Sequence, residues 1–490
     1  MANIRLVDVS IRDGNQSLWG AVGLNTAQVL QIAPTLDRVG FSHADFISST
    51  AIGMLIRTYR ENPWDYIRNT HKLMPNTPLQ FIGTGLRFIS WELQHPEFLQ
   101  LVYQCMVACG IYRFIVLDAM HDLPAMLRTA RMYREAGAGE VIAAMVYTVS
   151  EVHDDKYYAE LAASLAASPD IDTLYIKDPS GLLSPQRARS LIPAIRTRIG
   201  DKPLELHSHC TIGLGPLNYM EAAELEIDAL HVGCGPLGSG SSLPEAQRMV
   251  ANLRAMGHTV DIDDRALARV CDYWSRLAKA EGRPAGKAQD FDAAFLKHQV
   301  AGGVMSTTRR QLAEVGLEHR FEEVMEEVTR VRAELGYPIM VTPFPQMVCS
   351  QALYNVIGRE RYDNISDQLI RYALGKFGHP TAPIEPDILD KILSHPRASE
   401  LIHEPEPPTV AEMRKKFSPN LSDEEFLLRA TVPGEQLEAM HAAGPARLRY
   451  NPELQGVIKL LTELSTRPAT NIHIEKPGYR LSLQTTVTNE

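Results

Sequence analysis

Short apolar runs recur along the first half of the chain, and each ends at a polar residue or a glycine. Between them, apolar residues return every three or four positions, which is the period of an amphipathic helix. The apolar runs predict strands at 4–9, 43–47, 79–83, 112–117, 141–146, 173–176, 204–207 and 229–232. The helical stretches include 26–39, 96–109, 126–136, 156–167, 184–199 and 217–225.

Alternating strands and helices of this kind imply a parallel sheet, and about eight such units at this length predict a closed (β/α)8 TIM barrel. A doubly wound open sheet is the structural alternative. It is disfavoured because no Gly-x-Gly-x-x-Gly motif follows the first predicted strand.

Strand patterns nearly vanish after about residue 262. Helices are predicted at 264–281, 309–313, 321–335, 346–357, 366–374, 386–393, 409–416 and 422–429. A Gly- and Pro-rich stretch at 282–289 predicts a hinge, residues 403–408 read as a Pro-rich linker, and 471–490 alternate like a hairpin. We therefore predict a barrel domain at 1–280, a mainly helical domain at 281–402, and a linker with a C-terminal extension of unassigned role at 403–490.

Composition excludes several classes of protein. The net charge of −10 argues against a nucleic-acid surface. The sequence contains no run of about 18 apolar residues, so no membrane span is predicted. The N-terminus enters a strand without the apolar core of a signal peptide. The six cysteines are scattered without a Cys-x-x-Cys pair, so we expect a reducing cytoplasm.

Candidate chemistry gathers where the predicted strands end, which is where barrel enzymes place their active sites. Lys177 ends the sixth strand, and a buried lysine is costly unless it is paired or chemically changed. His207 and His209 end the seventh strand and, two positions apart, point the same way. With Asp13 after the first strand they form a workable divalent-metal site.

A fourth anionic ligand would complete that site. Lys177 supplies one only if CO2 carbamylates its neutral amine, so burial and the metal would have to lower its pKa. The loop 233–242 is rich in small residues, and we expect its backbone to approach a ligand.

Several stretches carry a resemblance to a known family. They are Arg12-Asp13-Gly-Asn-Gln16-Ser17, 147–153, Ile176-Lys177-Asp178-Pro-Ser-Gly-Leu-Leu183 and His207-Ser-His209, followed beyond the barrel by 297–303, 341–346 with 351–352, and 374–378. Together they resemble the carboxyltransferase domain of pyruvate carboxylase, the oxaloacetate decarboxylase alpha subunit and the transcarboxylase subunit of that group. The resemblance spans about residues 4 to 395.

The resemblance implies site roles. Asp13, carbamylated Lys177, His207 and His209 would bind a divalent metal, usually zinc, with manganese or cobalt in relatives. Arg12 and Gln16 would contact the substrate's oxygens. Ser306 falls where the family has a threonine that shuttles a proton. The implied reaction moves CO2 between carboxybiotin and the enolate of a 2-oxo acid, such as pyruvate or oxaloacetate, or of another small enolisable carbonyl compound.

The chain also departs from the family pattern. The first motif usually reads Asp-Ala-His-Gln-Ser, whereas here Gly-Asn follows Asp13, as in the isopropylmalate synthase group. The family's arginine for the pyruvate carboxylate is replaced by Ile82-Gly-Thr-Gly85, and the nearest arginine is Arg87. We expect these glycines to leave space for a bulkier or differently charged acceptor.

The expected partners follow from what the sequence lacks. It has no Met-Lys-Met biotinylation motif and no ATP-grasp region. We therefore expect biotin on a separate biotin carboxyl carrier protein, a separate biotin carboxylase subunit, and a small-molecule acceptor. The resemblance further implies a homodimer.

Other interpretations stay open at this point. The same barrel would suit a Claisen-type acyl transferase or a retro-aldol lyase of the isopropylmalate synthase and hydroxymethylglutaryl-CoA lyase superfamily, and a degenerate barrel would serve as a scaffold. Arg12 and Asp13 could form only a structural ion pair, Gln16 could cap a loop, and Ser306 could be a helix N-cap. His153 and Asp118 read as residues that support the ligands or pack a loop, and Cys210, adjacent to His209, could touch the metal site.

Overall fold

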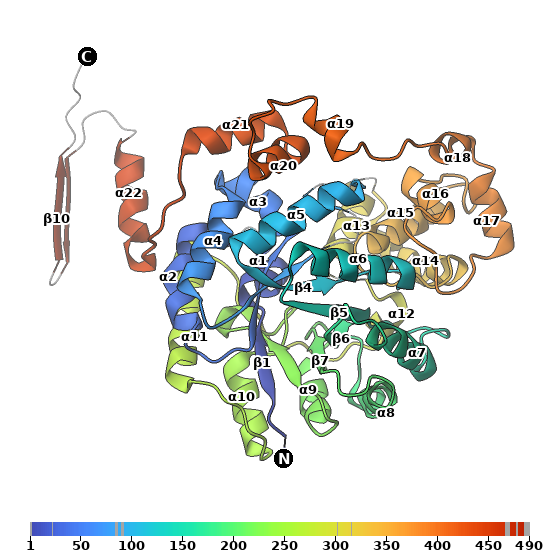
Figure 1. Cartoon of the computed structure of the whole chain (residues 1–490), viewed down its shortest axis with the longest axis horizontal. Coiled ribbons are helices and arrows are strands. Elements are labelled where there is room, and N and C mark those ends of the chain that lie inside the picture. The colour runs from blue at the N-terminus through green and yellow to red at the C-terminus, as the bar shows by residue number, and fades with distance from the viewer. Residues whose placement is uncertain are drawn as a thin grey trace.

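All eight predicted strands form, and they close into one parallel barrel in chain order (Figure 1). The computed structural model describes residues 2–21, 23–83, 87–89, 93–300, 302–314, 316–465, 471–476 and 479–484. The barrel strands are β1 (Arg5–Asp8), β2 (His43–Ser48), β3 (Leu79–Ile82), β4 (Ile111–Val116), β5 (Glu140–Val146), β6 (Thr173–Asp178), β7 (Leu204–Ser208) and β8 (Ala229–Val232). The predicted fold class, a TIM barrel followed by a mainly helical region, is confirmed.

Strand register brings the candidate residues to one rim. β6 pairs with β7 so that Lys177 lies opposite His207, and β8 closes the barrel against β1. Because the strands are parallel, their carboxyl ends all open on the same side. Residues far apart in sequence therefore meet above that end.

Helices cover the outside of the barrel, and short helical turns interrupt the loops at its rim. The outer helices are α2 (Thr26–Leu36), α4 (Pro63–Leu73), α5 (Pro96–Cys109), α6 (Leu123–Ala136), α7 (Asp155–Ala166), α8 (Pro185–Arg196), α9 (Gly215–Ala223), α10 (Ala246–Ala255) and α11 (Asp264–Glu281). The short elements are η1 (Ser10–Gly14), α1 (Asn15–Trp19), α3 (Ser49–Met54), η2 (Leu55–Tyr59) and η3 (Gly235–Leu237). The sequence prediction missed α4 and α10.

The missed helix α4 carries ordinary start signals. The Asn62 side chain accepts a hydrogen bond from the Trp64 N–H, and Pro63 occupies the first helical position. Helix α2 begins with a reciprocal capping box between Asn25 and Gln28. Local capping thus agrees with the barrel that the apolar pattern predicts.

The helical region after the barrel has a second hydrophobic core, built from residues between Val300 and Leu401 together with Met120 of the barrel. Its elements are α12 (Phe295–His298), α13 (Gly302–Glu314), η4 (Glu318–Arg320), α14 (Phe321–Glu334), α15 (Phe344–Ile357), α16 (Asp367–Ala373), α17 (Pro386–Leu393) and α18 (Pro396–Leu401). Ile339 from this region packs into the apolar interior of the barrel. The division of the chain at 281 and 403 stays a prediction.

The chain returns to the barrel after the Pro-rich linker. The remaining elements are α19 (Val410–Arg414), α20 (Asp423–Thr431), α21 (Gly434–Ala443), η5 (Pro452–Leu454), α22 (Gln455–Ser465), β9 (Asn471–Lys476) and β10 (Tyr479–Gln484). Phe426 of α20 is buried against Phe98 of α5, with ring centroids 6.2 Å apart. Figure 1 shows α22 and the β9–β10 hairpin set apart from the barrel.

The predicted hairpin is confirmed at β9 and β10, which pair antiparallel. Residues 477–478 and 485–490 of that prediction lie outside the described residues. Among the described helices, none has the length and apolar character needed to cross a membrane.

Candidate metal centre

Asp13 is held at the barrel rim by an unusual turn. After β1 the chain enters the π-helical turn η1, which buries both Arg12 and Asp13. A Cβ on Gly14 would lie 2.6 Å from the Leu237 carbonyl oxygen, so the loop after β8 packs directly against this turn. Glycine at position 14 therefore permits the close approach that fixes Asp13.

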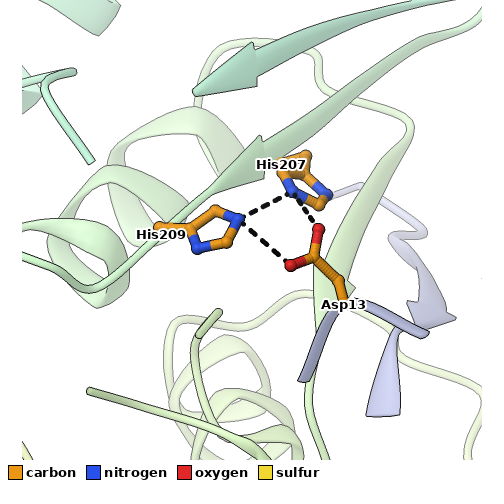
Figure 2. A group of neighbouring side chains, drawn as sticks. All are labelled: Asp13, His207 and His209. Carbon is orange, nitrogen blue, oxygen red and sulfur yellow. Dashed lines mark hydrogen bonds and ion pairs between the residues drawn. The ribbon is translucent and has the colours of Figure 1, made fainter. Parts of the chain in front are cut away.

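The two histidines converge on Asp13 from β7 and its continuation (Figure 2). His207 Nε2 lies 3.2 Å from Asp13 Oδ2, and His209 Nε2 lies 3.5 Å from Asp13 Oδ1. The two Nε2 atoms are 3.1 Å apart. All three side chains are buried, and their ligand atoms lie within 4.8 Å of one another.

The outer nitrogen of each histidine has a partner that orients the ring. His209 Nδ1 lies 2.6 Å from the Ser241 carbonyl oxygen, which can only accept, so Nδ1–H donates and Nε2 keeps its lone pair. His207 Nδ1 lies 3.1 Å from His231 Nδ1. Orienting contacts of this kind accompany metal-binding histidines.

Lys177 completes the group from β6. Its Nζ lies 3.1 Å from His207 Nε2 and 3.7 Å from Asp13 Oδ2. Burial lowers the pKa of the Lys177 ammonium to about 8, against the opposing attraction of Asp13. About a tenth of this amine is therefore neutral at pH 7.

Arg12 sets the charge of the site. It pairs with Asp13 Oδ2 at 3.0 Å and also with Asp45 of β2. Burial alone would raise the pKa of Asp13, but Arg12 and the two histidines hold it well below its ordinary value. The ion pair considered as a structural alternative does form, and Arg12 also lines the cavity described next.

A cavity of about 340 Å³ lies between the barrel rim and the helical region. Its lining from the barrel includes Arg12, Asp13, Gln16, Lys177 and His209. The segment 340–345 and Phe377 close it from the other side. This volume suits a small organic acid rather than a macromolecule.

Arg87 reaches the same cavity. Its guanidinium lies 5.0 Å from the centre of the Phe377 ring, and burial lowers its pKa. The expectation that the nearby glycines leave space for a bulkier acceptor is wrong at Gly83, because a Cβ there would lie 2.7 Å from the Tyr133 hydroxyl. Gly85 lies outside the described residues.

Gln16 and Ser306 are placed less directly. Gln16 is exposed on α1 and lines the cavity, and the C-cap of that helix is Gly20. Ser306 lies inside α13, four residues after the helix begins. The N-cap alternative for Ser306 is therefore wrong, and its side chain lies outside what the structure describes.

The small-residue loop 233–242 acts differently from our expectation. A Cβ on Gly233 would lie 2.5 Å from the Leu237 carbonyl, and one on Gly238 would lie 2.6 Å from the Gly233 carbonyl. These glycines allow the loop to pack on itself and against η1. The described cavity lining contains no residue of this loop.

Three further residues that the sequence raised lie outside the metal-capable group. Cys210 is buried, but the metal-capable group found among the described residues does not include it. Asp118 accepts hydrogen bonds from the N–H groups of its own loop and lines the cavity. His153 is hydrogen-bonded to Ser150 and Thr381 away from the metal-capable group.

Sequence reasoning missed His231 and Asp45, which contact His207 and Arg12. Both lie in apolar strand runs, and a polar residue inside such a run was an available signal. Asp178, the chain neighbour of Lys177, accepts from the N–H groups of Leu182 and Leu183 and so shapes the loop after β6.

The donor set fits a divalent metal. One carboxylate held ionised and two imidazole nitrogens with lone pairs aimed at a common point suit zinc and its neighbours, and a carbamate on Lys177 would add a fourth oxygen donor.

Comparison with known proteins agrees with this geometry. The model of the conserved carboxylase domain matches residues 295–472. A pyruvate carboxylase subunit of Methanocaldococcus jannaschii is 31% identical over 486 residues, which cover 96% of this chain and 83% of that protein. The 2-oxoglutarate carboxylase large subunit of Hydrogenobacter thermophilus is 30% identical, over 80% of this chain and 60% of that protein.

The solved carboxyl transferase domain of Rhizobium etli pyruvate carboxylase superposes with a TM-score of 0.82 at 21% identity, covering 99% of this chain and 84% of that one. That likeness concerns the fold. The family model matches the helical region and the residues after it, which favours the carboxyltransferase interpretation over the acyl transferase and lyase alternatives. The chain belongs to the family of biotin-dependent carboxylases that includes pyruvate carboxylase, and it is a carboxyltransferase.

Proposed function

We propose that this chain is the carboxyltransferase subunit of a multi-subunit enzyme and moves a carboxyl group between biotin and a small 2-oxo acid. The observation that carries the proposal is the group Asp13, Lys177, His207 and His209 at the edge of a cavity that also contains two arginines. Biotin would arrive on a separate carrier protein, charged by a separate biotin carboxylase. The relative in Methanocaldococcus jannaschii is itself named as one subunit of its enzyme.

Asp13, His207 and His209, with a carbamate on Lys177, would hold a divalent metal, zinc first and manganese or cobalt as alternatives. When bound, the metal supplies Lewis-acid stabilisation of negative charge on a substrate oxygen. Carbamate formation needs the neutral amine of Lys177. That amine adds to CO2, forms an N–C bond and releases one proton. Its lowered pKa supports this step.

The chain's cations would position the acceptor. Arg12 is fixed by Asp13 and Asp45, so its guanidinium enters the reaction already oriented toward the cavity. Arg12 and Gln16 would contact the oxygens that gain charge as the enolate forms. Arg87 would bind the acceptor's carboxylate, with its guanidinium held near Phe377.

The hydroxyl of Ser306 would move one proton. Ser306 would carry the proton from the carbon next to the acceptor's carbonyl to the ureido nitrogen from which CO2 departs. That carbon would then form the new bond to CO2. Ser306 lies on α13, the helix that reaches the cavity through Val304.

Among 2-oxo acids we favour pyruvate as acceptor, with oxaloacetate as its carboxylated form. The relatives include proteins named for pyruvate and for 2-oxoglutarate. The shared chemistry is a carboxylate beside an enolisable ketone, which suits two arginines in a cavity of about 340 Å³. We further propose a homodimer and a cytoplasmic location; the six cysteines, all buried and free, support a reducing compartment.

The test is biotin-dependent decarboxylation of oxaloacetate by the purified chain, with metal content measured on the same sample. We expect turnover to need both added biotin and the metal, and to disappear in Lys177→Ala. Intact-mass analysis under CO2 should show about 44 Da on Lys177. Turnover that ignores biotin, or survives complete metal removal, would contradict the proposal.

The acceptor assignment has its own test in Arg87→Lys. Loss of a planar, two-pronged contact to a carboxylate should raise the KM for pyruvate about 10- to 100-fold. The surface variant Arg189→Lys is the matched control. An unchanged KM in Arg87→Lys would remove Arg87 from the acceptor site.

A further inference from the structure

One ring nitrogen of His207 faces the metal-capable group, and the other faces away from it (Figure 2). The facing atom is Nε2, which lies near Asp13, His209 and Lys177. The other atom, Nδ1, lies 3.1 Å from Nδ1 of His231 on β8. Because this pair lies outside the metal-capable group, a proton rather than a metal joins the two nitrogens, so one of them donates and the other accepts.

The far side of His231 decides which nitrogen donates. His231 Nε2 lies 2.9 Å from Glu205 Oε2. Glu205 also accepts two hydrogen bonds from Arg113, whose guanidinium stays charged, at 2.8 and 3.2 Å. A carboxylate in that ion pair can only accept, so the proton between it and His231 is on Nε2.

The hydrogen-bond directions then propagate to the ligand. With Nε2 protonated, the Nδ1 of His231 carries the lone pair and accepts from His207 Nδ1–H. When a metal replaces the proton between His207 Nε2 and Asp13, His207 would then present its Nε2 lone pair toward Asp13 and His209. In the opposite arrangement, His207 would present an Nε2–H to the metal-capable group instead of a lone pair.

The ring of His231 is itself held firmly. It stacks on Tyr175 with ring centroids 5.5 Å apart and an interplanar angle of 11°. Both residues are buried inside the barrel. This packing therefore holds the His231 ring in one orientation relative to His207.

The contacts continue beyond Glu205 to the other end of the barrel. Arg113 also pairs with Glu140 at 2.9 Å, and Glu140 pairs with His43 at 2.9 Å. A proton cannot travel along this row, because the guanidinium in its middle does not release one. Its effect on the metal group is thus orientation rather than proton conduction.

We propose that His231 is a positioning residue that fixes the tautomer and ring orientation of the metal ligand His207 through the Glu205–Arg113 pair. The inference rests on the proposed metal centre. Outer partners of this kind change metal affinity about 10- to 100-fold when they are replaced.

Two variants separate the nitrogen atoms of His231. His231→Asn keeps an acceptor near the position of Nδ1. His231→Gln keeps a donor near the position of Nε2, toward Glu205, and removes the acceptor for His207. His43→Gln changes the far end of the same row of contacts and is the matched control.

The measurements are zinc affinity by competition with a chromophoric chelator, the visible spectrum of the cobalt-loaded protein, and the Tm of the metal-free protein. We expect His231→Gln to lose about 10- to 100-fold in zinc affinity and to change the cobalt spectrum. His231→Asn and His43→Gln should stay close to wild type in both readouts.

The outcomes separate the two claims. If the wild-type chain binds neither zinc nor cobalt, the proposed metal centre itself fails. If wild type binds and His231→Gln binds equally well, or if the Asn and Gln variants weaken binding alike with an equal fall in Tm, His231 has no positioning role.

Neutron diffraction from zinc-loaded wild-type crystals needs no variant. It should show hydrogen on His207 Nδ1 and His231 Nε2, and hydrogen on His231 Nδ1 would overturn the proposal.

Discussion

The barrel buries two clusters of charged residues that behave oppositely. At the carboxyl end, Lys177 and two histidine nitrogens crowd around the single carboxylate of Asp13 and face a cavity. At the other end, Arg113 lies between Glu205 and Glu140, so cation and carboxylates satisfy one another. Buried charge alone therefore does not indicate a binding site, whereas converging lone pairs beside a cavity do.

The largest effect expected from this contrast is on activity at the carboxyl end. Asp13→Asn should lower carboxyl transfer by about 10⁴-fold, since several kcal/mol of charge stabilisation depend on the metal. Arg12 keeps its pairing with Asp45, so the metal-free variant should stay folded. Steady-state kinetics, metal analysis and thermal unfolding check this prediction. Retained activity would contradict the functional role inferred for the cluster at the carboxyl end.

A substitution in the cluster at the opposite end of the barrel should lower stability rather than activity. Arg113→Met leaves the buried Glu205 and the half-buried Glu140 without their guanidinium partner, which should cost about 3–5 kcal/mol of unfolding free energy. Denaturant titration measures it. A loss of less than about 1 kcal/mol would show that Arg113 does not stabilise the fold by compensating the charges of Glu205 and Glu140.

How far the sequence predicts the molecule can be judged from these clusters. The strands were predictable because each is an apolar run with a distinct end, and Lys177 stood out as a charge at such an end. Arg113 and Glu205 carried the same signal within their strands and were overlooked. Their pairing depends on how β4 and β7, which are not neighbours in the sheet, face each other across the barrel interior.

The site was less predictable than the fold for physical reasons. The π-helical turn that aims Asp13 depends on packing against Leu237, more than 200 residues later in the chain. The role of Gly83 depends on the hydroxyl of Tyr133 on α6, not on any ligand. Contacts of this kind arise only once distant segments are brought together.

A smaller effect concerns pH. Burial would raise the pKa of Glu140, but His43 and Arg113 lower it from 4.5 to about 2. The stability that Glu140 contributes is therefore present above pH 4.5 and is lost as pH falls toward 2, at up to about 1.4 kcal/mol per pH unit. Burial also lowers the pKa of His43. Below about pH 6.5 this residue is protonated more readily in the unfolded state than in the folded state, so the unfolding free energy falls further.

Unfolding free energy measured from pH 7 to 3 checks this prediction, with Glu140→Gln as the matched variant. The variant should show a shallower fall below pH 4.5 than wild type. Identical slopes would mean that Glu140 is not held ionised by its neighbours.

The smallest effect is expected at the surface. Arg189 pairs with Glu221 at 2.6 Å, but its side chain is 65% exposed. Solvent screens such a pair, so Arg189→Gln should change neither Tm nor activity measurably. A clear loss of stability would show that exposure does not separate the buried clusters from surface pairs.

The most direct test of the metal centre is anomalous diffraction from crystals soaked in zinc. We predict one strong peak enclosed by Asp13, His207 and His209, with extra density on the Lys177 amine. No peak there, or a peak only elsewhere in the chain, would contradict the account.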